Sequence, residues 1–279
     1  SAVMLPRIGL TLRISDCVFN RPKDRGITST GTGCQGLIVD GCQFWSNEQP
    51  MLAQDRTSIA LNVNANDAKI RSNRVVRFAH FMVANGGGHL ISGNHFFQGD
   101  NAPSGIRRAG LILTQTNPRV TFTGNYVDNC FIEWSNEHDA FPDFTTGLGY
   151  GNLSIAGNHF YASGVAPWFR WIVIAPKGAG HFVQGLSISD NTFRAVNGAV
   201  DRVDAVDTTH ASLDYSRFRN VNVGSNAFNG VSQIVMNPLT ILHTQNTEAA
   251  TWVVDGGAFM PFGARVRNTQ SLVADVAIT

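Results

Sequence analysis

The residues best suited to chemistry lie between positions 133 and 139. Glu133, Glu137 and Asp139 are carboxylates, and Trp134 and His138 beside them are candidates for substrate binding. Two carboxyl groups cleave a glycosidic bond when they stand about 5 to 5.5 Å apart, with retention, or about 6.5 to 9.5 Å apart, with inversion. This segment therefore has residue types that could serve as the acid, base or nucleophile of such a reaction.

A plainer interpretation of the same segment is a turn. Asn136 and Asp139 are turn-forming residue types, and Glu137 would then be a solvated carboxylate. If the segment begins as a strand, Glu133 and Trp134 point to opposite faces, and the sequence does not say which face is outward. Both interpretations stay open at this stage.

A second run of carboxylates comes at Asp201, Asp204 and Asp207, with His210 close behind. These residues could ligate Ca²⁺, the one cofactor considered, because this ion prefers several oxygen ligands. Asp204 or Asp207 could also supply a partner acid to residues 133–139, since the two segments would lie about 10 Å apart in the repeat described below. One face of a short helix, or a solvated turn, is the alternative.

Aromatic and basic residues gather at Trp168, Arg170, Trp171 and Lys177. Indoles are flat apolar platforms with a polar edge, on which a sugar ring can stack. Arg170 and Lys177 could neutralise a uronate carboxylate, or the charge that develops when a lyase removes an α-proton. The alternative for Trp171 is core packing, whereas Trp168 follows a proline and is expected at the surface.

The elements that must position these residues come from an eight-residue phrase that occurs nine times. Its third position is always apolar, its sixth is mostly Asn, and its eighth is Phe or Val. The copies occupy residues 12–19, 37–44, 68–75, 89–96, 120–127, 153–160, 186–193, 221–228 and 252–259. Self-similarity at a period of about 30 residues indicates a stacked repeat architecture.

The phrase predicts a strand, a corner and a second strand. Positions one and three alternate with polar residues, as in a strand with one buried face. Positions six and eight are also inward but out of phase, so the chain must bend at positions four and five, where Gly, Asp and Ser recur. We expect Asn at position six to tolerate the left-handed backbone of this bend. Further apolar runs predict another face of the same tube, at 59–63, 81–83, 111–113, 132–134, 171–174 and 234–236.

The sequence therefore predicts an all-β solenoid of parallel strands with nine to ten coils. Identical positions would stack about 4.8 Å apart, which gives an internal Asn ladder at position six and a Phe stack at position eight. We expect residues 1–263 to form the solenoid. Residues 264–279 would form a strand-like tail that closes the stack or contacts a partner subunit.

The phrase, the ladder and the stack resemble the right-handed parallel β-helix proteins of the pectate-lyase-like superfamily. The resemblance extends from residue 12 to about residue 259, and it is specific for the fold rather than for the activity. It implies a polysaccharide or oligosaccharide lying along a rod, since similar proteins include polysaccharide lyases, glycoside hydrolases and trimeric phage tailspikes.

Two hypotheses follow from the resemblance. In the first, the chain is a glycan-binding spike or adhesin for host attachment, a homotrimer outside the cell or on a virion, with or without glycoside hydrolase activity. In the second, it is a secreted polysaccharide-cleaving enzyme, and a hydrolase is favoured over a lyase because acidic clusters outnumber basic ones. A carboxyl pair at hydrolytic distance in a groove would favour cleavage, and scattered carboxyls would favour recognition.

Composition limits the other classes of function. The net charge is only +1, from 21 basic and 20 acidic residues, so a nucleic-acid footprint is not expected. No apolar run approaches the roughly 20 residues of a membrane helix. Nothing before Leu12 resembles an end cap or an export signal, so we expect further N-terminal coils or another domain to cover that end.

The four cysteines have no metal-binding spacing. Cys17 and Cys42 share position six in adjacent coils, where they could form a disulfide or remain buried free thiols. We favour thiols, because this position needs interior residues whatever their chemistry. Cys34 and Cys130 belong to no motif.

Overall fold

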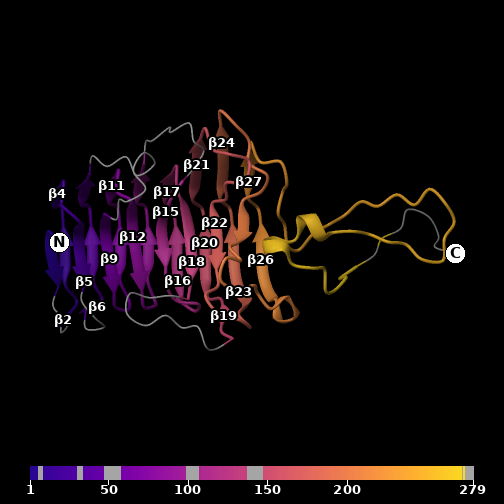
Figure 1. Cartoon of the computed structure of the whole chain (residues 1–279), viewed down its shortest axis with the longest axis horizontal. Coiled ribbons are helices and arrows are strands. Elements are labelled where there is room, and N and C mark those ends of the chain that lie inside the picture. Colours follow the sequence, from indigo (N-terminus) through magenta and orange to yellow (C-terminus); the bar gives the residue numbers. More distant parts are fainter. Residues whose placement is uncertain are drawn as a thin grey trace.

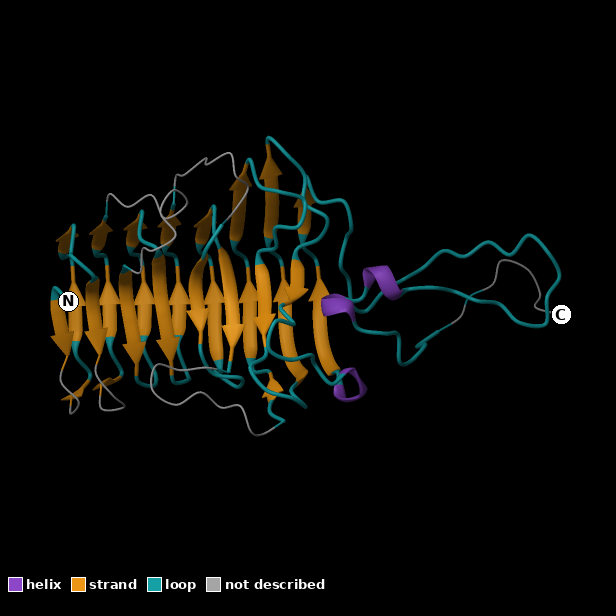
Figure 2. Cartoon of the chain, viewed as in Figure 1, coloured by secondary structure: helices purple, strands orange, loops and turns teal. Residues whose placement is uncertain are grey.

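Three parallel β-sheets form the faces of a rod (Figures 1 and 2). The structure is a computed structural model that describes residues 1–5, 9–29, 34–46, 58–98, 107–136, 147–271 and 273. Each turn of the chain adds one strand to every sheet, and that strand pairs in parallel with its counterparts in the coils before and after. The predicted right-handed parallel β-helix is confirmed.

Each sheet contains one strand from every coil, in the order of the coils along the rod. The first sheet holds β1 (Val3–Leu5), β5 (Arg25–Ser29), β9 (Ile59–Asn64), β12 (His80–Asn85), β15 (Ala109–Leu113), β18 (Phe131–Ser135), β22 (Ile172–Ala175) and β25 (Asp204–Val206). The second holds β3 (Arg13–Ser15), β7 (Ile38–Asp40), β10 (Lys69–Arg71), β13 (Leu90–Ser92), β16 (Val120–Thr123), β20 (Leu153–Ala156), β23 (Phe182–Ser189) and β26 (Arg219–Gly224). The third holds β4 (Val18–Asn20), β8 (Gln43–Trp45), β11 (Arg74–Val76), β14 (His95–Phe97), β17 (Tyr126–Asp128), β21 (His159–Ser163), β24 (Thr192–Val196) and β27 (Ala227–Asn229).

Few elements lie outside this pattern. β19 (Gly149–Tyr150) pairs with the beginning of β23, and β2 (Gly9–Leu10) pairs with β6 (Cys34–Gln35). Three short 3₁₀ helices, η2 (Tyr215–Arg217), η3 (Gly257–Phe259) and η4 (Pro261–Gly263), lie near the C-terminal end of the rod.

The corner between the second and third sheets lies at position five of the phrase. In eight coils this residue has a φ between 55° and 66°, and it is Asp16, Gly41, Ser72, Gly93, Gly124, Gly157, Asp190 or Ser225. Gly adopts this left-handed backbone without a Cβ penalty, which explains its frequency here. The expectation that Asn at position six adopts the left-handed backbone is wrong, because no described ladder Asn has a positive φ.

The Asn residues stabilise the corner through their side chains instead. The Oδ1 of Asn125 accepts hydrogen bonds from the Nδ2 and the backbone N–H of Asn94, at 2.9 and 3.0 Å. The Oδ1 of Asn158 does the same for Asn125, at 3.1 and 2.9 Å. The Nδ2 of Asn125 also donates to the carbonyl of Ile91 in the preceding coil, at 2.9 Å. This pattern continues from Cys42 to Asn226, so the predicted ladder is present.

The predicted Phe stack is present but interrupted. Ring centroids lie 4.6 Å apart for Phe19 and Phe44, 4.9 Å for Phe160 and Phe193, and 5.7 Å for Phe193 and Phe228. Val127 replaces the ring at position eight of the fifth coil. Phe122, from position three of that coil, fills the gap, with its ring centroid 6.5 Å from that of Phe96 and 6.4 Å from that of Phe160.

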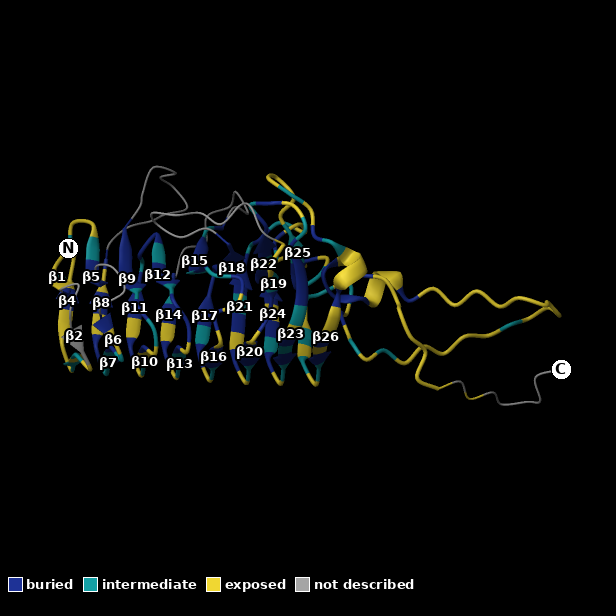
Figure 3. Cartoon of the chain, turned by 90° about the horizontal axis from the view of Figure 1, so that it is seen from below, coloured by how far each residue is buried: buried dark blue, intermediate teal, exposed yellow. Residues whose placement is uncertain are grey.

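The ninth phrase, residues 252–259, does not add a coil, so the described residues form eight. Residues 252–256 have no regular structure, and Trp252 and Val253 are exposed. Position six of this copy is Gly257, which has no side-chain amide and so cannot continue the ladder from Asn226. Beyond the last coil the chain leaves the rod as a largely exposed segment (Figure 3).

All four cysteines are free. Cys34, Cys42 and Cys130 are buried, and burial raises the pKa of the Cys42 thiol. The disulfide alternative is therefore not realised. The prediction that Cys17 is buried is wrong, because it lies in the first coil, where it is exposed.

Replacing one rung of the ladder should destabilise the rod. We expect Asn125→Leu to lower the free energy of unfolding by about 3 kcal/mol, because Asn94 loses its acceptor while the Ile91 carbonyl and the Asn158 side-chain oxygen lose a donor inside the core. Urea denaturation measures the effect. Thr121→Val, on the exposed face of the preceding strand, is the control, and equal midpoints for the two variants would show that the ladder contributes little.

The corner can be tested separately with reciprocal substitutions in adjacent coils. A Cβ at Gly93 would meet nothing within 4 Å, so Gly93→Ser changes only the cost of the left-handed backbone. We expect it to lower stability by about 1 kcal/mol, and Ser72→Gly, at φ 57°, to raise stability slightly. Thermal unfolding of both variants checks the signs, and a change in the same direction for both would contradict this account.

Candidate functional site

Glu133 points out of the rod from the middle of the first sheet. Ile132 and Trp134 on either side of it are buried, so alternation along β18 gives Glu133 the outward face. It stands in register with Ile112 of β15 and Val173 of β22. The question that the sequence left open is thereby settled for this carboxylate, which is half-buried.

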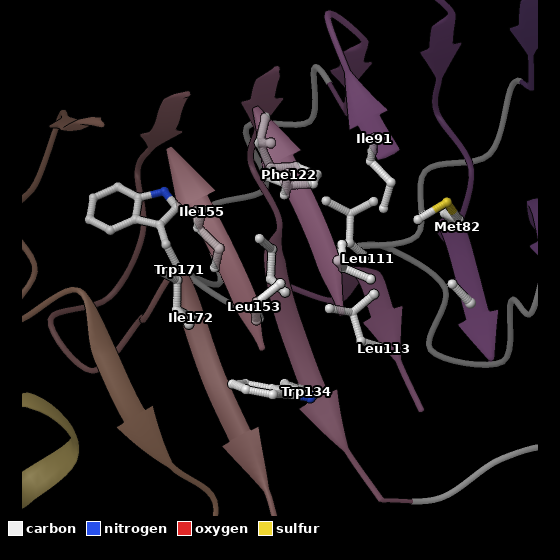
Figure 4. Close-up of a cluster of buried hydrophobic side chains, with 14 of the residues drawn as sticks. Met82, Ile91, Leu111, Leu113, Phe122, Trp134, Leu153, Ile155, Trp171 and Ile172 are labelled. Atoms are coloured by element: carbon white, nitrogen blue, oxygen red, sulfur yellow. The ribbon is translucent and has the colours of Figure 1, made fainter. Parts of the chain in front are cut away.

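Two of the three predicted sugar platforms are core residues. Trp134 is fully buried, its indole N–H donates to the carbonyl of Gln115 at 2.7 Å, and its ring meets that of Tyr150 edge to face at 5.1 Å. Trp171 is also fully buried within the rod (Figure 4), with its ring centroid 5.2 Å from that of Phe169 and 5.6 Å from that of Phe193. Neither indole can stack on a sugar. Trp168 is 59% exposed, as its position after a proline indicated.

Asp204 points into the rod rather than out of it. It lies opposite Ile172, in the row of inward positions, and is 1% exposed. One carboxylate oxygen accepts a hydrogen bond from the Nε of Arg202 at 2.6 Å, and the other accepts from the backbone N–H of Phe262 in η4. Arg202 also donates to the carbonyl of Met260 at 2.8 Å. Asp204 thus holds η4 at the end of the last coil, a structural role that leaves neither oxygen for a substrate.

Asp207 is exposed where the chain leaves the first sheet. Its carboxylate accepts hydrogen bonds from the hydroxyl and backbone N–H of Thr209, at 2.6 and 2.9 Å. The hydroxyl bond, with a smaller contribution from the nearby charges of His210 and Lys177, lowers the pKa of Asp207. Asp207 is therefore an ionised carboxylate that shapes a turn, as the plain alternative proposed.

The predicted cations lie apart from one another. Arg170 donates to the carbonyls of Pro167 and Phe169, at 2.7 and 2.8 Å, and to Asp201 at 3.4 Å. The backbone N–H of Lys177 donates to the side chain of Asn136 at 2.6 Å, at the other end of β22. Arg170 therefore stabilises the loop before β22 rather than joining Lys177 in one anion site.

The described carboxylates do not come together. Glu133 and Asp204 lie two coils apart, about 10 Å, and they point to opposite faces of the first sheet. Asp201, Asp204 and Asp207 have different partners, and the described part of the chain contains no group of three potential metal ligands. Glu137, His138 and Asp139 lie outside the described residues.

A hollow of about 580 Å³ opens instead on the outer face of the second sheet. Four residues at position two of consecutive phrases form its floor, namely Thr121, Ser154, Ser187 and Asn222. Arg119, Asn152 and Asn220, each just before its phrase, line the same hollow. The lining presents hydroxyls, amides and one guanidinium to solvent, and it contains no carboxylate.

Backbone geometry explains one border of the hollow. The residue just before each phrase is left-handed, with φ values of 49° at Arg119, 51° at Asn152 and 53° at Asn220. The chain therefore turns sharply there, and the segments before the turn flank the floor. This flank is fixed by the pairing of β19 with β23 and by the hydrogen bond of 2.8 Å from Arg219 to the side chain of Gln184.

One pattern in the sequence indicates this hollow. Position two of the phrase is charged in the first and third coils, at Arg13 and Lys69, but carries short hydroxyl or amide side chains from the fifth to the eighth. Short side chains at four adjacent strand positions leave a depression. The candidates at residues 133–139, 168–177 and 201–207 lie outside the phrase, whereas the depression lies on the repeat itself.

No protein-family model, curated protein or solved structure matches this chain. Among the described residues, no helix has the length and apolar character needed to cross a membrane.

The structural role of Asp204 can be tested directly. Asp204→Ala leaves Arg202 and the Phe262 N–H without their buried acceptor, so we expect a loss of about 3 kcal/mol and faster proteolytic cleavage around η4. Asp207→Ala removes an exposed turn carboxylate, and its cost should stay within about 0.5 kcal/mol. Chemical denaturation and limited proteolysis of both variants check this, and equal stabilities would contradict the assignment.

Proposed function

We propose that this chain is the polysaccharide-binding β-helix of a spike or adhesin that acts on bacterial surface or extracellular glycans, of the pectate-lyase-like type that its repeat resembles. The hollow on the second sheet carries the proposal. It is open, extends across four coils, and is lined by hydroxyl and amide side chains with one guanidinium, together with Val120, Leu153 and Leu186.

The spacing of the floor supports a polymeric ligand. Adjacent strands lie about 4.8 Å apart, which is comparable to the length of one sugar residue in an extended glycan. The floor residues therefore offer one hydroxyl or amide per coil to successive sugars of a chain that lies along the rod. Short side chains at fixed strand positions also lose little conformational entropy on binding.

Recognition is favoured over cleavage because of the carboxylates. None lines the hollow, and the described candidates are separated by the alternation of strand faces and by their own partners. A secreted hydrolase or lyase remains the alternative hypothesis, and Glu133 is the described carboxylate that would serve it, because it faces outward. The same experiment must therefore score both binding and cleavage.

The proposal includes the expected assembly. As in the trimeric spikes that the repeat resembles, three chains would stand side by side outside the cell or on a virion. Light scattering on the purified chain should give three times the 30.2 kDa of one copy. A monomer at every concentration tested would contradict the trimer.

Binding is tested by affinity gel electrophoresis in gels that contain alginate, xanthan, dextran or xylan. We expect retardation in at least one gel, and no release of reducing or unsaturated ends from the retained polymer. Retardation with release of ends would establish the enzyme hypothesis instead. Unchanged mobility in all four gels would contradict the proposed function.

A bulky side chain should block the hollow without disturbing the fold. We expect Ser187→Trp, on the floor, to weaken retardation by on the order of tenfold, equivalent to about 1.4 kcal/mol. Lys69→Trp places the same side chain at position two of a coil outside the hollow, and it should bind like wild type. If the two variants behave alike, the ligand does not occupy the hollow.

A further inference from the structure

The outer face of the third sheet carries a patch of aromatic side chains that the proposed site does not use. His95, Tyr126 and His159 stand side by side at position seven of three successive phrases. Phe97 and Tyr161 lie two residues further along two of the same strands. We call these five residues the aromatic face. All point outward, because the positions between them, such as Phe96 and Phe160, are buried in the core.

Ring contacts fix the middle of the aromatic face. The imidazole of His95 meets the ring of Tyr126 edge to face at 4.7 Å, and that of Phe97 at 5.9 Å. Side chains on a sheet have restricted rotamers, and such contacts restrict them further. The rings therefore form a preorganised surface, and a ligand that stacks on them would not have to order flexible side chains.

The polar atoms of this patch are available to a ligand. Among the residues that the structure describes, the hydroxyls of Tyr126 and Tyr161 and the imidazole nitrogens of His95 and His159 have no hydrogen-bond partner, and none of these atoms is buried. Burial, with the nearby charges of Asp128 and Tyr161, raises the pKa of Tyr126 to about 12, so its hydroxyl keeps its proton at neutral pH. Burial and the charge of Arg74 lower the pKa of His95, which is then a neutral donor and acceptor.

The exposed charges in the two described rows of the aromatic face have one sign. Arg74 precedes His95 in the same row, with its guanidinium 5.5 Å from the ring of Trp45, and Arg194 follows Tyr161. Both arginines are exposed. The one carboxylate in these two rows, Asp128, is 2% exposed and accepts a hydrogen bond from the side chain of Asn129 at 3.0 Å. A ligand on this surface therefore meets positive charge at both ends.

We propose that the aromatic face is a second glycan-binding surface, which stacks the pyranose rings of an acidic polysaccharide along the rod. The inference rests on the proposed function for the class of ligand, but it places the contact on a different sheet from the hollow. Rings about 4.8 Å apart match successive sugars, the hydroxyl and imidazole groups bond to sugar hydroxyls, and Arg74 and Arg194 pair with carboxylates of the polymer.

The composition of the surface favours a glycan over a second copy of the chain. The centre of a subunit interface is dry and depleted in groups that need hydrogen bonds. Here each ring except that of Phe97 carries a polar atom without a partner in the described part of the chain, and the exposed arginines would face the identical arginines of a twofold-related copy. A hydroxyl-rich, acidic polymer satisfies both the polar atoms and the charges.

The test uses the same gels with variants of the aromatic face. Tyr161→Ala and His95→Ala should each weaken retardation in alginate or xanthan by on the order of fivefold to tenfold, since each removes one stacked ring. Tyr126→Phe keeps the ring and should have a smaller effect. Thr192→Ala, next to His159 in the same row, is the matched control and should bind like wild type. Thermal unfolding confirms that all variants fold.

The outcomes separate the two proposals. If Ser187→Trp loses binding while the aromatic variants bind like wild type, the aromatic face is not a glycan surface and the hollow still is. If the aromatic variants lose binding and Ser187→Trp does not, the hollow fails and this inference holds. If the chain were retarded as strongly in dextran gels as in alginate gels, the preference for acidic polymers would be overturned. Oligomers that light scattering detects for wild type but not for Tyr161→Ala would show a subunit interface and overturn the inference.

Discussion

The rod depends on the hydrogen bonds that one amide makes to the coils on both sides of it. A sharp corner between two strands leaves backbone N–H groups that neither sheet can pair, and these groups lie in the interior, where an unpaired donor is costly. The side chain of Asn125 bonds to both neighbouring coils: its oxygen accepts the Asn94 N–H and its nitrogen donates to the Ile91 carbonyl in the preceding coil, and the same nitrogen donates to the Asn158 oxygen in the next. Since every coil supplies the same amide, each corner is completed by its neighbour, and the stack is stabilised as a whole.

Once the corners are fixed, alternation along the strands decides what each side chain can do. Asp204 and Glu133 lie in one sheet on β25 and β18, with only β22 between them, yet one is inward and the other outward. Asp204 therefore anchors η4, while Glu133 stays at the surface. The same rule places Ser187 in the hollow and Tyr126 on the aromatic face, on two sides of the ladder corner. The rod has no single active cleft among the described residues, but two extended faces suited to a polymer.

The phrase was sufficient to predict the fold, because its positions encode the buried rows directly. It failed at residues 252–259, where the apolar positions match but Gly257 cannot continue the ladder. The site was harder to predict. Trp134 and Trp171 have residue types that suit sugar stacking. Trp134 is a core residue because of its inward phase on β18, whereas Trp171 is buried just before β22, where its ring packs against those of Phe169 and Phe193. The phrase aligns three residues at position seven, namely His95, Tyr126 and His159. Their significance depends on the pairing of adjacent strands, which brings the three side chains together.

Amide hydrogen exchange tests the central claim most directly. The backbone N–H groups of Asn94, Asn125 and Asn158 donate to side chains of the next coil, so their exchange should be the slowest in the chain and should share one rate, that of global unfolding. Residues 239–255, which pair with no strand, should exchange within seconds. If these three amides exchanged as fast as residues 239–255, or at unrelated rates, the ladder would not hold the coils together.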